Sequence, residues 1–158
     1  MKKYLVIGNP IEHSLSPKLH NYWFEKNNID ANYDRRKTDK SEIQEIVNEI
    51  KDNKLDGINV TVPFKTDVIP FLDTLSEEAQ ITQSVNTIYM HDKKLVGHNT
   101  DIKGFELSLK DTQFDLNNKS IFILGAGGVV PSIIYALEKL GVSKISVSNR
   151  TKEKAEDL

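Results

Sequence analysis

The sequence predicts an α/β fold in which two sheets follow one another along the chain. Apolar runs typical of buried strands alternate with stretches of helical periodicity from residue 4 to residue 151, as in the βα units of a mainly parallel sheet. The alternation stops at the polar segment 111–119 and begins again at Ser120. We therefore expect a mainly parallel, three-layer domain over residues 1–103, a linking helix and boundary over 104–118, and the first, incomplete βαβ unit of a second sheet over 119–158.

The composition excludes several classes of protein. The chain has no cysteine, which excludes disulfides, cysteine-ligated zinc and thiol catalysis. Its formal net charge of -2 gives no general attraction for a polyanion, so we expect no nucleic-acid partner. No apolar stretch approaches the roughly 20 residues that cross a bilayer, and the N-terminal apolar run is too short for a signal peptide. We expect a cytoplasmic protein with no membrane partner. The four histidines are scattered, so we expect no metal.

The most regular pattern in the first domain is a helix opened by Ser41. Its apolar residues Ile43, Ile46, Val47 and Ile50 repeat every three or four positions and so share one face. The other elements expected here are a strand at 4–7, a helix opened and capped by Ser16 with Leu19, Tyr22 and Trp23 on one face, strands at 32–36 and 57–62, a helix at 76–82, and a hairpin of 84–90 and 94–98 that turns at Asp92 and Lys93.

A glycine-rich turn marks the second domain. Gly125-Ala126-Gly127-Gly128 lies directly between a predicted strand at 120–124 and a predicted helix at 130–140. In a Rossmann domain such a turn brings backbone amides and a helix N-terminus to a pyrophosphate, and a turn without any ligand is the alternative. Gly141 then ends the helix, and a second strand covers 144–148. A doubly wound nucleotide domain needs about six strands, so we expect the sequence to be truncated.

The residues that follow the second strand of this unit favour one dinucleotide over the other. NAD-binding domains place a carboxylate at this position against the ribose hydroxyls. Here the sequence is Asn149-Arg150-Thr151. A guanidinium can hold a 2′-phosphate through charge-assisted hydrogen bonds, which favours NADP. The alternative is a solvated arginine at the start of a helix.

Polar side chains also occur at the predicted strand ends of the first domain, where parallel sheets usually collect ligands. Ser14 and Ser16 flank an apolar residue in the turn after the first strand. Asn59 and Thr61 share one face of a later strand, and Asn86 lies on another strand beside a threonine. The hydroxyls and amides predict a ligand rich in hydroxyl groups. Ser16 could equally serve only as a helix cap.

Lys65 and Asp101 are the candidate pair for proton transfer. Lys65 lies just past the end of the strand that carries Asn59, and Asp101 opens the linking helix. In a shared cleft the two could hold a hydroxyl and move its proton as hydride leaves the adjacent carbon. The alternatives are a solvated surface lysine and an acidic residue placed favourably in the first turn of a helix.

These motifs occur in the order found in shikimate dehydrogenases. The chain resembles that family from Tyr4 to Thr151, in Ser14-Leu15-Ser16-Pro17, in the segment from Asn59 to Lys65, in Val85-Asn86-Thr87, in Asn99-Thr100-Asp101 with Gly104-Phe105, in the glycine turn and in Asn149-Arg150-Thr151. The resemblance implies the reversible, NADPH-linked reduction of 3-dehydroshikimate to shikimate, a step in chorismate and aromatic amino acid biosynthesis.

The resemblance also implies residue roles. Lys65 would be the catalytic proton-transfer residue with Asp101 as its partner. Glu77 matches a position associated with the cofactor, although it could also be an exposed residue in the first turn of a helix. The implied ligands of the substrate are Ser14, Ser16, Asn59, Thr61, Lys65, Asn86 and Asp101. The implied ligands of NADP are Glu77, Gly125, Ala126, Gly127, Gly128, Val129, Asn149, Arg150, Thr151, Lys152, Glu153 and Lys154.

The chain departs from the family pattern at two places. Val129-Val130-Pro131 stands where relatives commonly carry small residues and an arginine, which predicts weaker cofactor binding. Thr82-Gln83-Ser84 stands where a Gly-Ala pair is more usual, which predicts an altered floor of the substrate pocket. Family members also continue further, to a helix with substrate-contacting Tyr and Gln residues that this sequence does not contain.

Two other interpretations stay open at this point. In one, the chain is a non-catalytic fragment that binds shikimate. In the other, the enzyme also accepts quinate or uses NAD, although Arg150 argues against NAD. The sequence leaves both a monomer and a homodimer open.

Overall fold

The computed structural model describes residues 1–158, and the backbone forms two compact units. The first unit is Met1–His98 and the second is Asn99–Leu158. Each unit contains its own sheet. The sequence-based limits at residues 103 and 118 stay a prediction about how the chain is organised.

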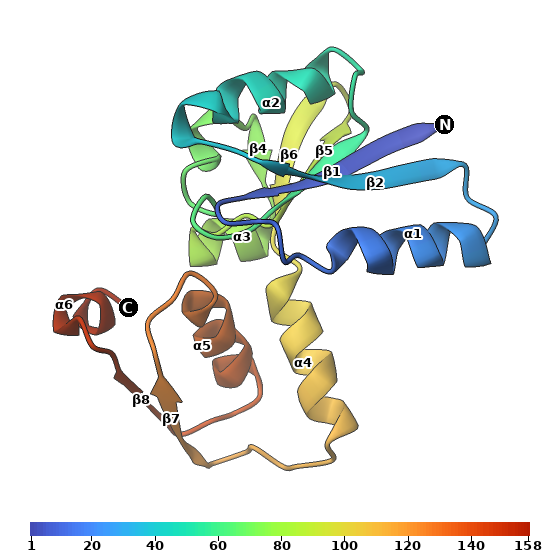
Figure 1. The fold of residues 1–158 in the computed structure, drawn as a ribbon. Coiled ribbons are helices and arrows are strands. Elements are labelled where there is room, and N and C mark those ends of the chain that lie inside the picture. The colour runs from blue at the N-terminus through green and yellow to red at the C-terminus, as the bar shows by residue number, and fades with distance from the viewer. The chain divides into compact units, whose positions relative to one another are not determined.

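The first unit is built on a six-stranded sheet of order β2-β1-β3-β5-β6-β4 (Figure 1). Three of its five strand pairings are parallel, and the two formed by β5 are antiparallel. The expected mainly parallel α/β sheet is therefore confirmed. The strands are β1 (Lys2–Gly8), β2 (Ala31–Lys37), β3 (Gly57–Val60), β4 (Thr74–Leu75), β5 (Thr87–His91) and β6 (Lys94–His98).

The helix α2 (Ile43–Lys51) covers one face of this sheet (Figure 1). Its predicted apolar stripe is confirmed, because the four aliphatic side chains on that stripe are all buried. They join the large core cluster with β-strand residues such as Ile7 and Ile88. Burial of each such side chain contributes about 1.5–3 kcal/mol. A 3-10 turn, Lys40–Glu42, precedes the helix, and the reciprocal bonds of Asp39 and Glu42 cap that turn, two residues before the predicted Ser41.

The helix α1 (Ser16–Lys26) lies on the opposite face, which gives the first unit three layers (Figure 1). A smaller core cluster of Val6, Ile11 and Tyr33 forms on this side, with Phe24 packed against it. The predicted cap by Ser16 is wrong, because the helix has no side-chain cap and Ser16 is its first residue. Instead, the Ser14 hydroxyl accepts a hydrogen bond from the Ser16 amide at 3.3 Å. The aromatic stripe predicted on this helix, Leu19, Tyr22 and Trp23, lies on its exposed face.

The remaining elements of the first unit follow the prediction closely. The hairpin of β5 and β6 turns at Asp92 and Lys93, both with positive φ. The helix α3 (Glu77–Thr82) is capped by Ser76, whose hydroxyl accepts from the Ala79 amide. The strand β3 ends two residues earlier than predicted, at Val60, because Thr61 enters a turn that its carbonyl closes with the Phe64 amide. The short strand β4 and a 3-10 turn at Ile69–Phe71 were not predicted.

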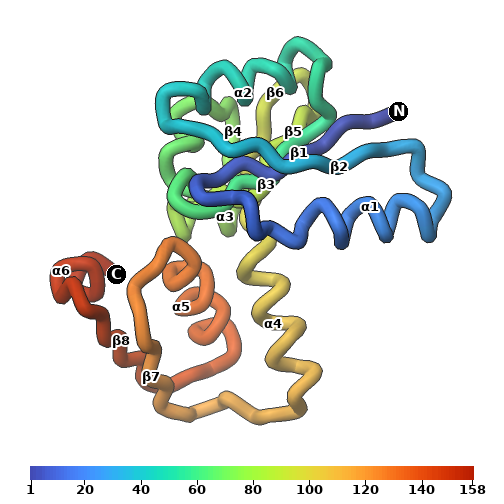
Figure 2. The backbone as a smooth tube through the Cα atoms, in the orientation of Figure 1, coloured from blue at the N-terminus to red at the C-terminus, as the bar shows by residue number.

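The second unit contains one βαβ crossover, which Figure 2 follows from β7 through α5 into β8. β7 and β8 pair in parallel over their full lengths, as predicted. Gly141, at φ 79°, follows the helix as expected of a C-terminal glycine. The helices and strands are α4 (Asp101–Asp111), β7 (Ser120–Leu124), α5 (Val130–Lys139), β8 (Lys144–Ser148) and α6 (Lys152–Glu156).

A buried carboxylate joins the two main helices of this unit. Glu106 on α4 lies 3.4 Å from the Lys103 ammonium and 3.3 Å from the Lys139 ammonium on α5. Burial alone raises the pKa of Glu106, and the two lysines outweigh that effect, so its net pKa is lowered. No helix in the chain combines the length and the apolar character needed to cross a bilayer.

Candidate functional site

The carboxyl ends of β1 and β3 form a small cavity in the first unit. It has a volume of about 250 Å³ and is lined by Pro10, Ile11, His13, Ser14 and Thr61. Both strands are followed by a cis X-Pro bond, Asn9-Pro10 and Val62-Pro63. The structure therefore brings Ser14 and Thr61 together, as expected for two residues at neighbouring strand ends.

Gly8 allows Thr61 to take this position. A Cβ at Gly8 would lie 2.6 Å from the Thr61 Cγ2 and 3.1 Å from the Val62 carbonyl oxygen. The Thr61 amide donates to the Ile7 carbonyl at 2.9 Å, which holds the turn against β1. A side chain at position 8 would push this turn away from the strand.

Asn59 lies at the centre of a polar network inside the first unit. The Tyr33 hydroxyl donates to its Oδ1 at 2.6 Å. Its Nδ2 donates to the Asn86 carbonyl oxygen at 3.1 Å and to the Thr87 Oγ1 at 3.0 Å. The Thr87 hydroxyl in turn donates to the Asn86 Oδ1 at 3.0 Å. The structure thus joins Asn59 on β3 to Asn86, 27 positions away in sequence and directly before β5.

Ser16 lies close to the Tyr33 hydroxyl. Burial raises the pKa of this phenol and outweighs the opposite effect of the Ser16 side chain. The phenol is protonated at neutral pH and acts as a donor to Asn59. Its ring stacks on the imidazole of His20, with ring centroids 4.1 Å apart and planes 5° from parallel.

Lys65 follows the turn after β3. Its side chain is half-buried, and the neighbouring Phe64 is buried. Its backbone carbonyl accepts a hydrogen bond from the amide of Val85 at 2.8 Å. Because Val85 directly precedes Asn86, this bond fixes the Lys65 backbone beside the segment that leads into β5. Asn86, predicted to lie on the strand, directly precedes it, since β5 begins at Thr87.

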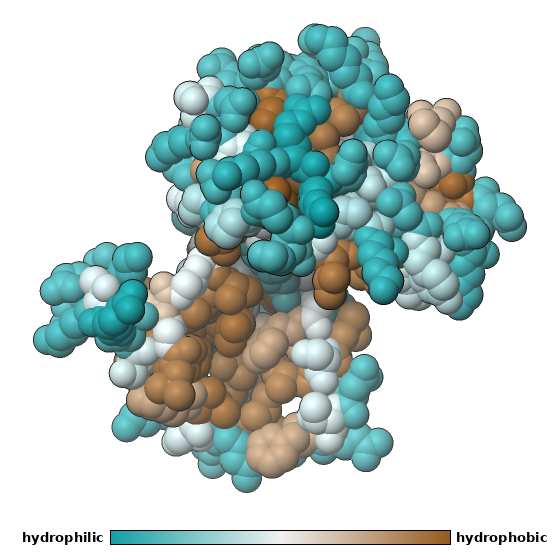
Figure 3. All heavy atoms as spheres, in the orientation of Figure 1, coloured by the Kyte–Doolittle hydropathy of each residue, from teal (hydrophilic) through white to brown (hydrophobic).

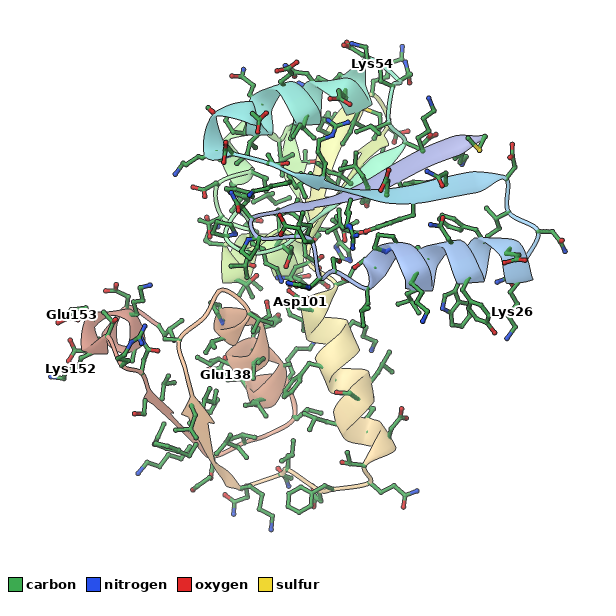
Figure 4. The ribbon with its side chains drawn as sticks, viewed as in Figure 1. Lys26, Lys54, Asp101, Glu138, Lys152 and Glu153 are labelled. Atoms are coloured by element: carbon green, nitrogen blue, oxygen red, sulfur yellow. The ribbon has the colours of Figure 1, made fainter.

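Asp101 is the first residue of α4 in the second unit, where Figure 4 labels it. Its amide donates to the Asn99 Oδ1 at 2.9 Å. The Asn99 Nδ2 donates to the Ser132 hydroxyl on α5 at 2.8 Å, and both side chains are buried. The start of α4 is therefore tied to the first turn of α5. Lys65 belongs to the other compact unit, and its pairing with Asp101 stays a prediction.

The glycine turn has the geometry that a pyrophosphate site needs. Gly125 has φ 110°, a conformation that residues with a side chain rarely adopt. Apart from the glycines themselves and their neighbours in sequence, no atom lies within 4 Å of the point where a side chain would begin at Gly125, Gly127 or Gly128, so the turn is open for a ligand to approach the backbone. The ten-residue helix α5 begins directly after it. A diphosphate fits this turn on shape and on the helix dipole.

Asn149 holds the glycine turn to the start of α6. Its Oδ1 accepts from the Ala126 amide at 3.2 Å, and its Nδ2 donates to the Thr151 carbonyl at 2.8 Å. The Gly125 amide donates to the Ser148 carbonyl at 2.7 Å. Both ends of the Asn149 amide thus bind backbone, so its side chain shapes the predicted cofactor site in addition to lining it.

The charged candidates for the cofactor lie on exposed surface. Arg150, Lys152, Glu153 and Lys154 are all exposed, and Figure 4 shows Lys152 and Glu153 on α6 projecting outward. Lys152 pairs with Glu156 one helical turn away at 3.0 Å. Arg150, Lys152 and Lys154 place three cationic donors within five residues, and Glu153, Glu156 and Asp157 balance their charge. A phosphate here would therefore depend on directed hydrogen bonds from the arginine more than on net charge.

Glu77 is exposed in the first turn of α3. It lies in the first unit, whereas the glycine turn lies in the second. Its predicted association with the cofactor stays a prediction.

Residues 6–88, more than half of the chain, match the family described as the shikimate dehydrogenase substrate binding domain. The chain belongs to the shikimate dehydrogenase family. Residues 106–158 match a second family description, shikimate / quinate 5-dehydrogenase. The family predicted from the motifs is confirmed.

Relatives in the family match the chain over almost its whole length. The shikimate dehydrogenase (NADP(+)) of Pelagibacter ubique strain HTCC1062 is 59% identical over 157 residues, which are 99% of this chain and 59% of that protein. The shikimate dehydrogenase (NADP(+)) of Acinetobacter baumannii strain AYE is 41% identical over 157 residues, which are 60% of its length. The chain thus spans about three fifths of these relatives.

Solved structures of the family have the same fold. The shikimate dehydrogenase of Aquifex aeolicus is 41% identical, with a TM-score of 0.93 over 99% of this chain and 59% of that chain. The shikimate 5-dehydrogenase of Thermus thermophilus, solved in complex with NADP(H) and shikimate, is 32% identical with a TM-score of 0.89, over 99% of this chain and 59% of its own.

The structure gives a physical reason for expecting weaker cofactor binding at the first departure from the family pattern. The Val130 amide already donates to the Gly127 carbonyl at 2.9 Å, and Pro131 has no amide proton. Two positions in the first turn of α5 therefore offer no donor to a phosphate. The prediction of reduced affinity itself stays to be measured.

The second departure from the family pattern, Thr82-Gln83-Ser84, places a residue with a side chain in an unfavourable backbone conformation. Gln83 ends α3 in the left-handed region, at φ 49°, where a glycine carries no penalty. Thr82 and Ser84 on either side are buried. This segment leads directly into Val85 and Asn86, so the departure lies next to a predicted substrate ligand.

Sequence reasoning missed two residues that support the family motifs, Tyr33 and Ser132. Tyr33 is the only large apolar side chain in the otherwise polar strand β2, and this isolation was a usable signal for burial. Ser132 had no such signal, because its partner Asn99 lies 33 positions away.

Proposed function

We propose that this protein is an NADP-dependent shikimate dehydrogenase that reversibly reduces 3-dehydroshikimate to shikimate. The observation that carries the proposal is the network of Asn59, Thr87 and Asn86, which aligns several hydrogen-bonding groups within the region that matches the family's substrate-binding domain. A ring with several hydroxyls and a carboxylate needs directional donors and acceptors of this kind.

We assign substrate binding to side chains at the strand ends of the first unit and to the start of α4. Ser14, Ser16 and Thr61 supply hydroxyls, and Asn59 and Asn86 supply amides. The support is their clustering: Ser14 and Thr61 line one cavity, and the two asparagines share hydrogen bonds. Asp101 completes the proposed set from the second unit.

Lys65 is the proposed acid and base of the reaction. In the reductive direction its ammonium gives a proton to the ketone oxygen as a hydroxyl forms, and in the oxidative direction the neutral amine takes that proton back. Asp101 would keep the lysine in the proton-carrying form by its negative charge. NADPH, when bound, supplies the hydride to the carbonyl carbon.

The proposed cofactor site uses backbone for the pyrophosphate and cations for the 2′-phosphate. The turn from Gly125 to Val129 would hold the pyrophosphate, and Arg150 with its neighbours from Asn149 to Lys154 would hold the adenosine side. The open turn and the three exposed cations support this division. Glu77 would contribute from the first unit.

Quinate is a second candidate substrate, because the family matched by residues 106–158 is described by both acids. The test is an absorbance assay of NADPH consumption with 3-dehydroshikimate, run beside assays of shikimate and quinate oxidation with NADP and with NAD. We expect turnover with shikimate and NADP to exceed that with quinate or NAD. A calorimetric titration that shows shikimate binding without any turnover would instead favour the non-catalytic interpretation.

We also propose that the protein works in the cytoplasm, since it has no cysteines and a biosynthetic reduction draws on reduced cofactor there. Its proposed partners are the substrate and the cofactor alone. Light scattering of the purified protein distinguishes a monomer from a homodimer, both of which the sequence allows.

A further inference from the structure

We propose that Tyr33 stabilises the orientation of the Asn86 side-chain amide through a series of hydrogen bonds that all run in one direction, and that it is thereby a positioning residue for substrate binding. This inference rests on the proposed function. Tyr33 itself hydrogen-bonds to Asn59, one of the predicted substrate ligands. Its effect would pass through Asn59 and Thr87.

Tyr33 is held rigidly enough to act in this way. The Asn21 side chain on α1 binds both backbone groups of Tyr33: its Nδ2 donates to the Tyr33 carbonyl at 2.8 Å, and its Oδ1 accepts from the Tyr33 amide at 2.9 Å. The phenol ring stacks on His20 and is only 3% exposed. The hydroxyl therefore has little freedom to point elsewhere.

The direction of the chain begins with the phenol. Burial raises the pKa of Tyr33, so the hydroxyl keeps its proton, and it donates at 2.6 Å to the Asn59 Oδ1. An amide whose oxygen accepts on one side must present its NH₂ on the other. Asn59 accordingly donates to both the Asn86 carbonyl and the Thr87 Oγ1.

Thr87 passes the direction on to Asn86. Its hydroxyl accepts from Asn59, so its own proton is directed to the Asn86 Oδ1, at 3.0 Å. The Asn86 backbone is also fixed, because its amide donates to His98 and its carbonyl accepts from Val60. With backbone and side-chain oxygen both held, the Asn86 NH₂ has one direction, and it would meet a ligand as a donor rather than as an acceptor.

The orientation matters for affinity because an amide that is free to flip offers a donor only part of the time. Without the Tyr33 proton, the Asn59 Oδ1 loses its donor and the amide is held only by its Nδ2 bonds to the Asn86 carbonyl and to Thr87. The contact that directs the Thr87 hydroxyl to the Asn86 Oδ1 is then less well fixed. Loss of one oriented hydrogen bond of this kind corresponds to a roughly 3- to 10-fold weaker Kd.

The experiment compares four substitutions, and one combination of two of them, in the full chain. Each protein is isotopically labelled for NMR. Tyr33→Phe removes the first proton and keeps the ring on His20, and Thr87→Val breaks the last link. Tyr89→Phe is the matched control, since Tyr89 is an exposed tyrosine on β5. Thr87→Ser keeps the hydroxyl. Shikimate Kd is measured by calorimetry, the Asn86 side-chain NH₂ signals by NMR, and folding by thermal melting.

We expect Tyr33→Phe and Thr87→Val each to raise the Kd for shikimate roughly 3- to 10-fold and to shift the Asn86 NH₂ signals. The double variant Tyr33→Phe/Thr87→Val should bind shikimate no more weakly than the single variant with the higher Kd, because both substitutions interrupt the same series of hydrogen bonds. Tyr89→Phe and Thr87→Ser should match the unmodified protein. An unchanged Kd together with unchanged Asn86 signals in a folded Tyr33→Phe protein would overturn the inference.

The two proposals can fail separately. If the unmodified protein binds no shikimate, the proposed function fails, and the role in binding fails with it. The hydrogen-bond chain is then decided by the Asn86 signals in Tyr33→Phe alone: a shift supports it and no shift overturns it. If shikimate binds and only Tyr33→Phe has no effect, the function stands and the inference falls.

Discussion

The two units hold their predicted binding groups by different means. In the first unit both hydrophobic core clusters lie within Met1–His98, and polar side chains such as Asn59 and Thr87 fix one another. In the second unit the predicted site is a backbone turn with exposed cations beside it, while β7 leaves Phe122 63% and Leu124 82% exposed. Figure 3 shows the visible face of the second unit largely hydrophobic over β7 and α5, and the visible face over α2 largely hydrophilic.

This difference matches the chemistry of the two proposed ligands. A polyhydroxy acid differs from similar acids in the directions of its hydroxyls. A protein recognises those directions through side-chain donors and acceptors that are held in fixed orientations. A dinucleotide is held mainly by its phosphates, for which backbone amides, a helix N-terminus and an arginine suffice. The substitutions that follow should therefore separate the two units by which ligand they affect.

The largest effect should come from Lys65 in the first unit. Lys65→Ala should lower turnover roughly 10²- to 10⁴-fold and change shikimate binding much less, because a positioned proton donor acts mainly in the transition state. Steady-state kinetics with both substrates measure this. Lys54→Ala removes another lysine of the same unit, which pairs with Asp52 on the surface, and should leave turnover unchanged. Normal turnover in Lys65→Ala would remove this residue from the chemistry.

A smaller and more selective effect should come from Arg150 in the second unit. Arg150→Ala should weaken NADPH binding about 10- to 100-fold, the worth of charge-assisted hydrogen bonds to a phosphate, and should hardly change NADH binding. Fluorescence titration with each cofactor measures the difference. Shikimate affinity is the internal control, and equal losses for NADPH and NADH would contradict the assignment of the 2′-phosphate to this side chain.

Substitutions at two positions with positive φ should change the free energy of unfolding in opposite directions. Gly125→Ala should lower the free energy of unfolding by about 1–2 kcal/mol, because alanine is strained at φ 110° although space is open around it. Gln83→Gly, at φ 49° in the first unit, should raise it by about 0.5–1 kcal/mol, less whatever its side-chain bond to Gln80 contributes. Urea unfolding of each variant checks both signs, and a stabilising Gly125→Ala would refute the strained turn.

The smallest effect should be a pH dependence in the first unit. Burial lowers the pKa of His20 below its ordinary value of 6.5, so the unfolded chain binds more protons there than the folded one. Above pH 6.5 the imidazole is neutral in both states, and His20 does not lower the free energy of unfolding. As the pH falls below 6.5, the free energy of unfolding decreases, because the unfolded chain takes up the proton first. His20 lines a cavity of about 600 Å³ in the first unit, and the charged residues that line it with His20 are Met1, Lys2 and Asp30.

The measurement for His20 is the melting temperature between about pH 7.5 and pH 5.5. His20→Gln should show a flatter profile than the unmodified protein over that range. A profile with the same slope in both proteins would show that His20 carries no part of the dependence.

Local patterns in the sequence predicted most elements but few of the partners. The stripe from Ile43 to Ile50 and the strands β7 and β8 depend on periodicity over neighbouring residues, and they were predicted almost to the residue. The motif residues could be assigned because their spacing resembles a family. The bond from Tyr33 to Asn59 could not, because it depends on the register of β2 against β1 and of β1 against β3.

Side-chain caps show the same limit on a smaller scale. A serine before a proline predicts a cap, yet Ser14 rather than Ser16 accepts the bond at the start of α1, since the helix begins one residue earlier than a capping Ser16 would require. Periodicity gives the face on which a residue lies, whereas the identity of its partner depends on the assembled fold.

The central claim is that side chains of the first unit bind shikimate and that the backbone turn of the second unit binds NADP. Two backbone-amide NMR titrations of the same labelled protein test it most directly. Shikimate should shift signals around Ser14, Thr61 and Asn86, and NADP should shift those of Gly125 to Val129 and of Arg150. Shifts from both ligands in one set of residues, or NADP shifts that leave the glycine turn untouched, would contradict it.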